Sequence, residues 1–354
     1  MTLKGRKNHY NVKLLRGYGV SITLKDNKIS LKNGTDVFGH AEKEDWFVTR
    51  MPYEKIVISG RGYVSTDAIK LLSEKNVNVI LTDTYGNLIS SMNGIMSSHI
   101  STRYRMGQYD AFRDPDKVKY LRRKLLVDKL ESQINFFKTL EKPELNRAIS
   151  KLELYKNQVC NLVELKDFLI NESRSGHIYF TNYAGLFDVK HKFDSRRGGG
   201  GRISNRYASD IINALLNYGY TVLAGEICKF VNGFGLDPYY GFYHRSHSGF
   251  QALVYDIIEP FRWLVEYSVY KLSILHNKDQ MISKNDYTWT REGKVVMDSD
   301  LIRRFLEILE RKFLSERPYT FGHGMKRKDG MSMCQEITIT KIVTQSLVDF
   351  CSRK

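Results

Sequence analysis

The sequence predicts an α+β protein in which a β-rich, sandwich-like N-terminal domain is followed by an all-α C-terminal domain. Two patterns indicate this fold class. Before residue 95, short apolar segments alternate with turn signals such as Asn33-Gly34, whereas after residue 101 apolar side chains recur with the 3.6-residue period of a helix. With 354 residues, of which 42% are hydrophobic, the chain is also long enough to give each domain its own core.

The N-terminal domain is expected to span residues 1–95 and to consist of short strands with one helix against them. Ser65 is a candidate N-cap for that helix, because the residues up to Leu72 follow it at helical spacing. Strands of the length and spacing seen here favour a small sandwich. We expect them at residues 14–15, 20–24, 36–38, 46–49, 55–58 and 77–81.

A linker is expected at residues 96–101, within a stretch rich in Ser, Met, Asn and Gly that begins at Ser90. The helical domain, residues 102–354, follows it. Asp114-Pro115 has the pattern of an N-cap followed by proline at the first helical position. Further helices are expected at residues 144–185, 209–231, 250–273, 299–313 and 333–350, and a short hairpin at residues 287–296.

The charge of the chain favours a polyanionic partner. Lys and Arg number 55 against 39 Asp and Glu, a formal net charge of +16, and 22 Tyr and 18 Phe supply rings that can stack on bases. The N-terminus lacks the apolar core of a signal peptide and no apolar run is long enough to span a membrane, so we expect a cytoplasmic protein without membrane contact. Four scattered cysteines without a C-x-x-C pattern indicate neither a zinc ribbon nor a disulfide framework.

Acids in so basic a protein need an explanation, and a divalent metal ion is one. Asp256 and Glu259 are three residues apart on an expected helix, so their carboxylates can leave the same face. A turn after Pro238 can fold His244 back over that helix, and Glu172 comes from a separate expected helix. Carboxylates with one imidazole suit Mg²⁺ or Mn²⁺, and such an ion can activate a water or a 3′-hydroxyl against a phosphodiester.

The same residues also have structural interpretations. An acid pair beside Arg262 can be a surface ion pair, Glu172 can lie on a solvated helix face, and His244 can be a packed, hydrogen-bonded histidine. Around Gly198 to Gly201, arginines favour a flexible basic loop that contacts DNA strands, but a solvated loop without function fits equally well. Candidates for binding DNA are Arg103, Arg105, Arg196, Arg197, Arg202, Arg245 and Arg262.

Four segments together resemble a known family. They read IVISGRGYVS (56–65), NALLNYGYTVL (213–223), GLDPYYGFYH (235–244) and LVYDIIEPFR (253–262). In this order they are similar to the motifs of the CRISPR adaptation integrase, CRISPR-associated protein 1, and the likeness extends from about residue 14 to residue 313. Two departures stand out: four glycines where the family often has a proline in an Arg-rich loop, and His247 where a basic side chain would suit a phosphate.

The resemblance implies a β domain that forms a homodimer and a helical domain that carries the active site. It implies that Glu172, His244 and Glu259 are the catalytic metal ligands, with Asp256 as a neighbouring acid that supports the site or joins it. The implied activity is Mn²⁺- or Mg²⁺-dependent cutting of DNA and joining of a short DNA's 3′-hydroxyl ends into a CRISPR repeat array. Expected partners are double-stranded and branched DNA, a second copy of the chain and CRISPR-associated protein 2.

Two other functions are also compatible with the sequence. A related mobile-element integrase of the casposon type would use the same fold and site. A DNA-binding scaffold without catalytic activity would keep the fold, although the retained Glu172, His244 and Glu259 argue against it.

Overall fold

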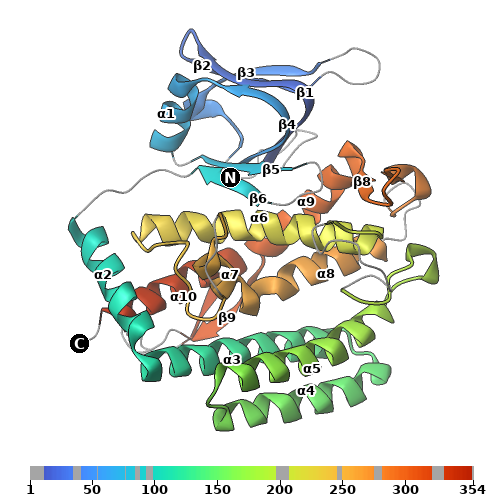
Figure 1. Cartoon of the computed structure of the whole chain (residues 1–354). Coiled ribbons are helices and arrows are strands. Elements are labelled where there is room, and N and C mark those ends of the chain that lie inside the picture. Colours follow the sequence, from blue (N-terminus) through green and yellow to red (C-terminus); the bar gives the residue numbers. More distant parts are fainter. Residues whose placement is uncertain are drawn as a thin grey trace.

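The computed structural model describes residues 12–34, 41–53, 55–75, 77–83, 88–92, 99–196, 207–244, 249–274, 281–320 and 331–352. The N-terminal part is rich in strands and the rest is mainly helical (Figure 1), which confirms the predicted fold class. The strands are β1 (Val12–Lys25), β2 (Lys28–Lys32), β3 (Lys43–Phe47), β4 (Lys55–Val64), β5 (Asn78–Thr82) and β6 (Leu88–Met92), with the short helix η1 (Val48–Arg50) after β3.

These strands form one six-stranded sheet in the order β3-β2-β1-β4-β5-β6, rather than the two separate sheets of the predicted sandwich. The reason is that β1 pairs in parallel with β4 along most of its length, and so joins both halves into one sheet. The pairing shifts register between Tyr18 and Val20, where Gly17 and Gly19 take positive φ angles of 89° and 87°. The segment predicted as a strand at 36–38 lies outside the described residues.

Helix α1 (Thr66–Glu74) begins where the sequence predicts it, and the Ser65 hydroxyl accepts a hydrogen bond from the N–H of Ala68 at 3.3 Å. Strand β6 and helix α2 (His99–Arg113) extend into the two ends of the linker stretch, whose middle, residues 93–98, lies outside the described residues. Asp114 caps α3 (Pro115–Thr139) as predicted, since its carboxylate accepts hydrogen bonds from the N–H groups of Asp116 and Lys117.

The remaining helices are α4 (Asn146–Gln158), α5 (Leu165–Ala184), α6 (Ile211–Gly233), α7 (Ala252–Ile258), α8 (Arg262–Ser273), α9 (Ser299–Leu314) and α10 (Glu336–Cys351). Short 3-10 turns separate or flank them: η2 (Pro143–Leu145), η3 (Val159–Asn161), η4 (Val189–His191), η5 (Glu259–Phe261) and η6 (Lys284–Asp286). The helix predicted over 250–273 is divided at η5, because Pro260 has no N–H to continue the α-helical hydrogen bonds.

The helical domain also contains two hairpins. The predicted one pairs β7 (Tyr287–Trp289) with β8 (Val295–Met297). The other, β9 (Glu316–Thr320) with β10 (Met331–Gln335), was not predicted, and it takes the first residues of the helix expected at 333–350. Met333 is exposed and Cys334 buried, so this stretch alternates with the period of a strand.

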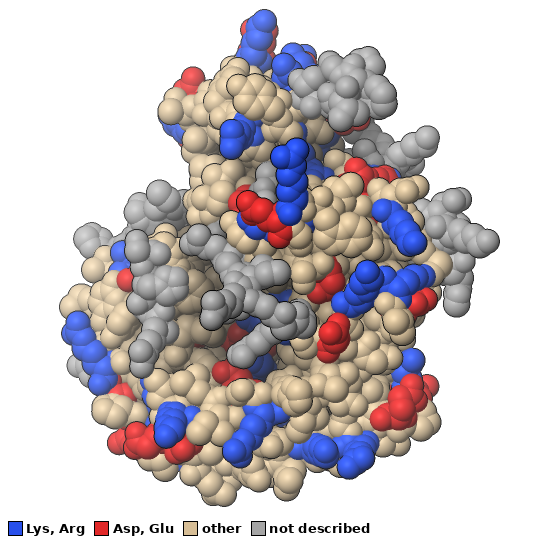
Figure 2. Space-filling model, turned by 45° about the vertical axis from the view of Figure 1, so that its right-hand side comes forward, with Lys and Arg blue, Asp and Glu red and all other residues tan. Residues whose placement is uncertain are grey.

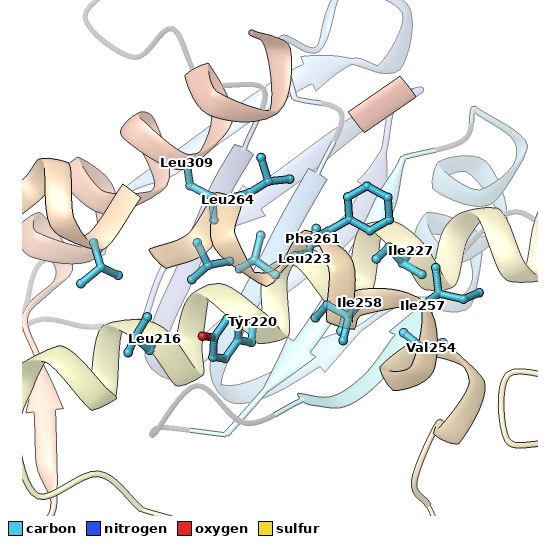
Figure 3. Close-up of a cluster of buried hydrophobic side chains, with 14 of the residues drawn as sticks. Leu216, Tyr220, Leu223, Ile227, Val254, Ile257, Ile258, Phe261, Leu264 and Leu309 are labelled. Carbon is cyan, nitrogen blue, oxygen red and sulfur yellow. The ribbon is translucent and has the colours of Figure 1, made fainter. Parts of the chain in front are cut away.

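Helix α6 is the centre of the fold. It is buried along most of its length, with the β5–β6 end of the sheet on one side and α7, α8, α9 and α10 on others (Figure 1). Figure 3 shows its Leu216, Tyr220, Leu223 and Ile227 among side chains of α7, η5 and α8. A helix that is apolar all round belongs in such a position. On the other side of α7 and α8, the helices α3, α4 and α5 lie side by side, and α3 packs against η5.

Two further predictions concern the cysteines and the membrane. All four cysteines are free thiols, three of them buried, which agrees with the absence of a disulfide framework. Among the described helices, none has the length and the apolar character that crossing a membrane requires.

Candidate active site

The structure brings Glu172 and Glu259 together around one lysine. Glu172 is on α5, Glu259 is the first residue of η5, and Lys129 reaches them from α3. The Nζ atom of Lys129 lies 2.5 Å from Oε1 of Glu172 and 2.7 Å from Oε2 of Glu259. The break at Pro260 and the packing of α3 against η5 thus place two acids from distant parts of the chain within reach of a single cation.

His244 is held beside this pair by Asp256, which is fully buried. One carboxylate oxygen of Asp256 accepts the backbone N–H groups of Phe242 and Tyr243, at 2.7 and 3.0 Å. The other accepts the N–H of His244 at 2.8 Å and lies 2.7 Å from Nδ1 of its ring. Because Nδ1 is engaged in this way, Nε2 is the ring nitrogen left to act as a ligand.

These contacts give Asp256 a supporting role. Both of its oxygens are occupied by the turn and the ring, and Gly241 leaves room for it, since a Cβ there would lie 2.6 Å from Oδ2. The carboxylate therefore fixes the conformation of the turn and the orientation of the imidazole. Of the two roles that the sequence left open for Asp256, the structure favours support of the site over direct ligation.

The remaining oxygens of the two glutamates also have partners. The Tyr243 hydroxyl donates to Oε2 of Glu172 at 2.6 Å, and Arg262 lies 2.9 Å from Oε1 of Glu259. The guanidinium of Arg262 also sits over the ring of Tyr220, 4.6 Å from its centroid. Arg262, predicted to bind DNA, thus holds a carboxylate in place within the protein.

Electrostatics keep the two glutamates ionised. Burial alone would raise the pKa of Glu259, but the charges of Arg262, Lys129 and His244 outweigh burial and lower it to about 2. Burial likewise opposes the charges around Glu172, yet Lys129 keeps its pKa below the ordinary value. For His244, burial is outweighed by the hydrogen bond to Asp256 and the charge of Glu259, so its pKa is raised. Both carboxylates are therefore negative, and Lys129 and Arg262 balance their charge.

Access to the site is through Glu172 and His244. Their side chains are 23% and 29% exposed, whereas those of Lys129 and Glu259 are 13% and 2% exposed. Lys129 and Glu259 are thus mostly buried, whereas Glu172 and His244 are partly exposed. A ligand arriving from solvent would meet the carboxylate of Glu172 and the imidazole of His244 first.

The donor set fits a divalent metal ion by its chemistry. Two ionised carboxylates and one imidazole match Mg²⁺ or Mn²⁺, with Asp256 behind the histidine as such ligands usually require. Oε2 of Glu259 is buried, and within the described part of the chain it accepts no aligned hydrogen bond, although Lys129 is 2.7 Å away as an ion partner. In the same part of the chain no three His, Cys, Asp or Glu side chains converge closely enough to enclose a metal ion as they stand, and Lys129 occupies the place between the glutamates.

The predicted DNA-binding arginines lie in several separate parts of the chain. Arg103 and Arg105 are exposed on α2, where Nε of Arg105 donates to the carbonyl of Gly235 at 3.2 Å. Arg196 donates hydrogen bonds to the amide oxygens of Asn213 and Asn217 at 2.6 and 3.0 Å. Its guanidinium lies over the rings of Phe180 and Tyr220. Arg197, Arg202, Arg245, His247 and the four glycines from Gly198 lie outside the described residues.

Sequence reasoning missed Lys129 and the role of Tyr243. A signal for Lys129 was present, because it lies four residues after Leu125 and three after Leu126, in a stripe of α3 that is mostly apolar and buried. A charged residue in such a stripe has a partner in the interior. No pattern in the sequence identified Tyr243 as the donor to Glu172.

Comparison with known proteins decides the family. The model of the family described as "CRISPR associated protein Cas1" matches residues 16–311. The chain belongs to the Cas1 family. The resemblance drawn from the four sequence segments is thereby confirmed.

Individual relatives agree with this assignment. A CRISPR-associated endonuclease Cas1 of Archaeoglobus fulgidus is 28% identical over 266 residues, which are 70% of this chain and 73% of the relative. Among solved structures, a casposase bound to integration product aligns with a TM-score of 0.82 and 22% identity, over 96% of this chain and 90% of that one. A Cas6-RT-Cas1–Cas2 complex aligns at 0.71 and 17% identity, over 96% of this chain and 34% of that one. At such identities the two structures support the Cas1-like fold alone.

Proposed function

We propose that this Cas1-family protein is a metal-dependent DNA endonuclease and integrase, which joins the 3′-hydroxyl ends of short DNA into a CRISPR repeat array. One observation carries the proposal: Glu172 and Glu259, both ionised, face a single cation beside a histidine that Asp256 orients. That site belongs to a protein of net charge +16, which long-range attraction would bring to DNA.

Glu172, His244 and Glu259 would hold a Mn²⁺ or Mg²⁺ ion. When bound, such an ion lowers the pKa of a water or hydroxyl and neutralises charge on a phosphodiester. The protein's own groups prepare the site for it. Asp256 favours the tautomer with the proton on Nδ1, Tyr243 fixes the rotamer of Glu172, and Arg262 fixes that of Glu259. Preorganisation of this kind lowers the cost of assembling the ligands when the ion arrives.

DNA would be held by basic side chains around the site. Figure 2 shows Lys and Arg spread over both the strand-rich and the helical parts of the described surface, interspersed with Asp and Glu. Exposed Arg103 and Arg105 on α2 suit phosphate contacts, and Arg197, Arg202 and Arg245 are proposed on sequence grounds. Arg196 would act indirectly, because its guanidinium anchors the start of that arginine-rich segment to α6.

Two macromolecular partners besides DNA are part of the proposal. A second copy of the chain would cover β3, which is an edge of the described sheet, and aromatic side chains that the β domain exposes at Tyr18 and Tyr63. CRISPR-associated protein 2 would join that dimer. The solved Cas6-RT-Cas1–Cas2 complex, which aligns with this fold, supports the choice of partner.

A casposon-type integrase is the second candidate, because a casposase bound to integration product has the same fold over 96% of this chain. The two candidates share chemistry and differ in target. An integration assay with a CRISPR repeat and with a mobile-element target site as competing acceptors would separate them. Preference for the repeat would support the CRISPR role, and preference for the other site would support the casposon role.

The chemistry itself is tested with labelled short duplexes and branched DNA. We expect cleavage or joining with Mn²⁺ or Mg²⁺, and none in EDTA. Glu172→Ala should abolish both reactions and leave DNA affinity intact or slightly higher, because a negative charge near phosphate is removed. Reaction that continues undiminished in EDTA would refute the metal mechanism, whereas no reaction with either metal would favour the DNA-binding scaffold.

A further inference from the structure

Lys129 occupies the position from which a metal ion would contact both glutamates. Its Nζ is 2.5 Å from Oε1 of Glu172 and 2.7 Å from Oε2 of Glu259, the two acids that the proposed function assigns to the metal. Only the contact with Glu172 has the alignment of a hydrogen bond. The ammonium group and a divalent ion cannot lie between the same two oxygens at once.

The helix that carries Lys129 is held by the core, whereas the lysine side chain is long enough to change conformation without moving the helix. α3 runs over 25 residues, and Leu125, Leu126 and Leu130 around this lysine are buried in the large core. The Cα of Lys129 therefore cannot shift without disturbing that core. Four methylenes separate it from the ammonium, which can move away by rotation about χ angles alone. A move toward Glu172 and His244 leads to the more exposed side of the site.

Charge balance gives the lysine a reason to be there. Around the site Glu172, Glu259 and Asp256 are negative, and Arg262 and Lys129 are the positive side chains in contact with the glutamates. Without Lys129, Arg262 would remain beside Glu259, and Glu172 would keep the neutral hydroxyl of Tyr243 as its hydrogen-bond donor. Like charges held close together and away from water repel strongly, so the pair needs a second cation whenever no metal is bound.

We propose that Lys129 is a built-in cation that closes the metal site of the metal-free protein, and that Mn²⁺ or Mg²⁺ binds by displacing its ammonium group. The proposal rests on the proposed function, since it takes Glu172 and Glu259 as the ligands. Lys129 keeps the glutamates ionised and correctly spaced, and it weakens metal binding because each ion must first compete with it.

A second buried lysine supplies the matched control. Lys55 on β4 lies 2.6 Å from Glu310 and 3.8 Å from Glu226, and all three side chains are less than 10% exposed. The described neighbours of that cluster include the amide of Asn78, which donates to Glu226 at 3.0 Å, in place of an oriented imidazole. Lys55→Met and Lys129→Met therefore remove the same charge from similar pairs of acids. Only Lys129→Met frees carboxylates that we assign as metal ligands.

The test is a Mn²⁺ titration of the full chain, followed by electron paramagnetic resonance and isothermal calorimetry. We expect Lys129→Met and Lys129→Gln to bind Mn²⁺ about tenfold more tightly than the wild type or more, and Lys55→Met to bind like the wild type. Lys129→Arg keeps the charge and should show no gain. In EDTA, Lys129→Met should melt at a lower temperature than the wild type and recover with Mn²⁺.

Labelling of the wild type gives a readout that no variant's folding can affect. Acetic anhydride should modify Lys129 slowly in EDTA and faster with saturating Mg²⁺, while modification of Lys55 stays unchanged. Equal or weaker Mn²⁺ binding by both Lys129 variants, or labelling of Lys129 that metal leaves unchanged, would overturn the competition. Failure of the wild type and every variant to bind Mn²⁺ would instead overturn the proposed metal site, and the competition with it.

Discussion

Two lysines of this protein each stand between two glutamates, in clusters with opposite surroundings. Lys55, Glu226 and Glu310 join the β domain to α6 and α9, and their side chains are 6%, 5% and 9% exposed. Around Lys129, the carboxylate of Glu172 is 23% exposed, and His244 lies at its edge. The first cluster is buried between the sheet and the helices, whereas in the second Glu172 and His244 are partly exposed to solvent.

The comparison shows that residue types alone do not define a metal site. A lysine with two glutamates balances charge equally well in both places. What distinguishes the cluster around Lys129 is a histidine whose ring is hydrogen-bonded to Asp256, and the partial exposure of Glu172 and His244. The cluster around Lys55 has a structural task, because it fixes the β domain on the helices together with Asn78 and the close approach of Ile80 to Gly225.

The largest expected effect separates the clusters by catalysis. Glu259→Gln should lower the rate of DNA joining about 10³-fold or more, because a bound metal supplies several kcal/mol to phosphodiester chemistry. Glu310→Gln should leave the rate near that of the wild type and lower the free energy of unfolding by about 1–3 kcal/mol. Single-turnover assays and urea unfolding measure the two quantities. If the rate of DNA joining fell equally in Glu259→Gln and Glu310→Gln, the two clusters would not differ in function.

Orientation of the histidine should matter next. Asp256→Asn removes the anion that holds Nδ1 of His244, and we expect Mn²⁺ affinity to fall about 10- to 100-fold. Glu226→Gln, at the other cluster, is the control and should bind Mn²⁺ like the wild type. Calorimetric titration of both variants decides the point, and an unchanged affinity in Asp256→Asn would show that the ring needs no such support.

The free energy of unfolding at acid pH should depend on the ionised carboxylate of Glu259 beside Lys129. The pKa of Glu259 is about 2 in the folded protein and 4.5 ordinarily, so between these values the unfolded chain binds a proton that the folded chain does not. The contribution of Glu259 is complete above pH 4.5 and is lost as the pH falls toward 2. It amounts to at most about 3 kcal/mol. Urea unfolding in EDTA across this range should show a shallower decline for Glu259→Gln than for the wild type, and parallel declines would contradict the assignment.

The smallest effect concerns DNA binding around the glycine segment. Arg196 is anchored to Asn213 and Asn217, so Arg196→Ala should lower thermal stability. Replacing Arg197 and Arg202 by Ala should instead weaken DNA binding for all sequences, and flatten its salt dependence by about 0.9 for each phosphate that the protein no longer neutralises. DNA titrations between low and physiological salt measure that slope. An unchanged slope would indicate that the segment is a solvated loop without phosphate contacts.

Part of the arrangement around His244 could be predicted from the sequence, for identifiable physical reasons. The helical spacing of Asp256 and Glu259 and the turn signals at Pro238 and Gly241 are visible in the sequence, and the structure brings His244 to Asp256. Both depend on residues close together in the chain, and a single sequence displays such neighbours directly. Glu172 was different, because local spacing could not link it to residues more than 70 positions away. It was a candidate as an acid on a separate expected helix, and the resemblance to the family implied that it joins the other ligands.

The partners of Lys129 and the form of the sheet were beyond this kind of reasoning. The position of Lys129 among buried leucines of α3 indicates a partner in the interior, but the partners are known only once α5 and η5 are placed against α3. The single sheet depends on the parallel pairing of β1 with β4, and its partners are more than 40 residues apart. The hairpin of β9 and β10 was missed because the alternation at residues 331–335 is short and runs directly into the apolar period of α10. Each of these features is decided by tertiary contacts.

The central claim, that Glu172, His244 and Glu259 hold a divalent metal ion, is tested most directly by anomalous diffraction from crystals soaked in Mn²⁺. We predict one anomalous peak in contact with the carboxylates of Glu172 and Glu259 and with Nε2 of His244, with the ammonium of Lys129 moved away from it. The peak should be absent in Glu259→Gln crystals soaked alongside. A wild-type protein that joins DNA with Mn²⁺ yet shows no peak there, or shows it on other residues, would contradict the claim.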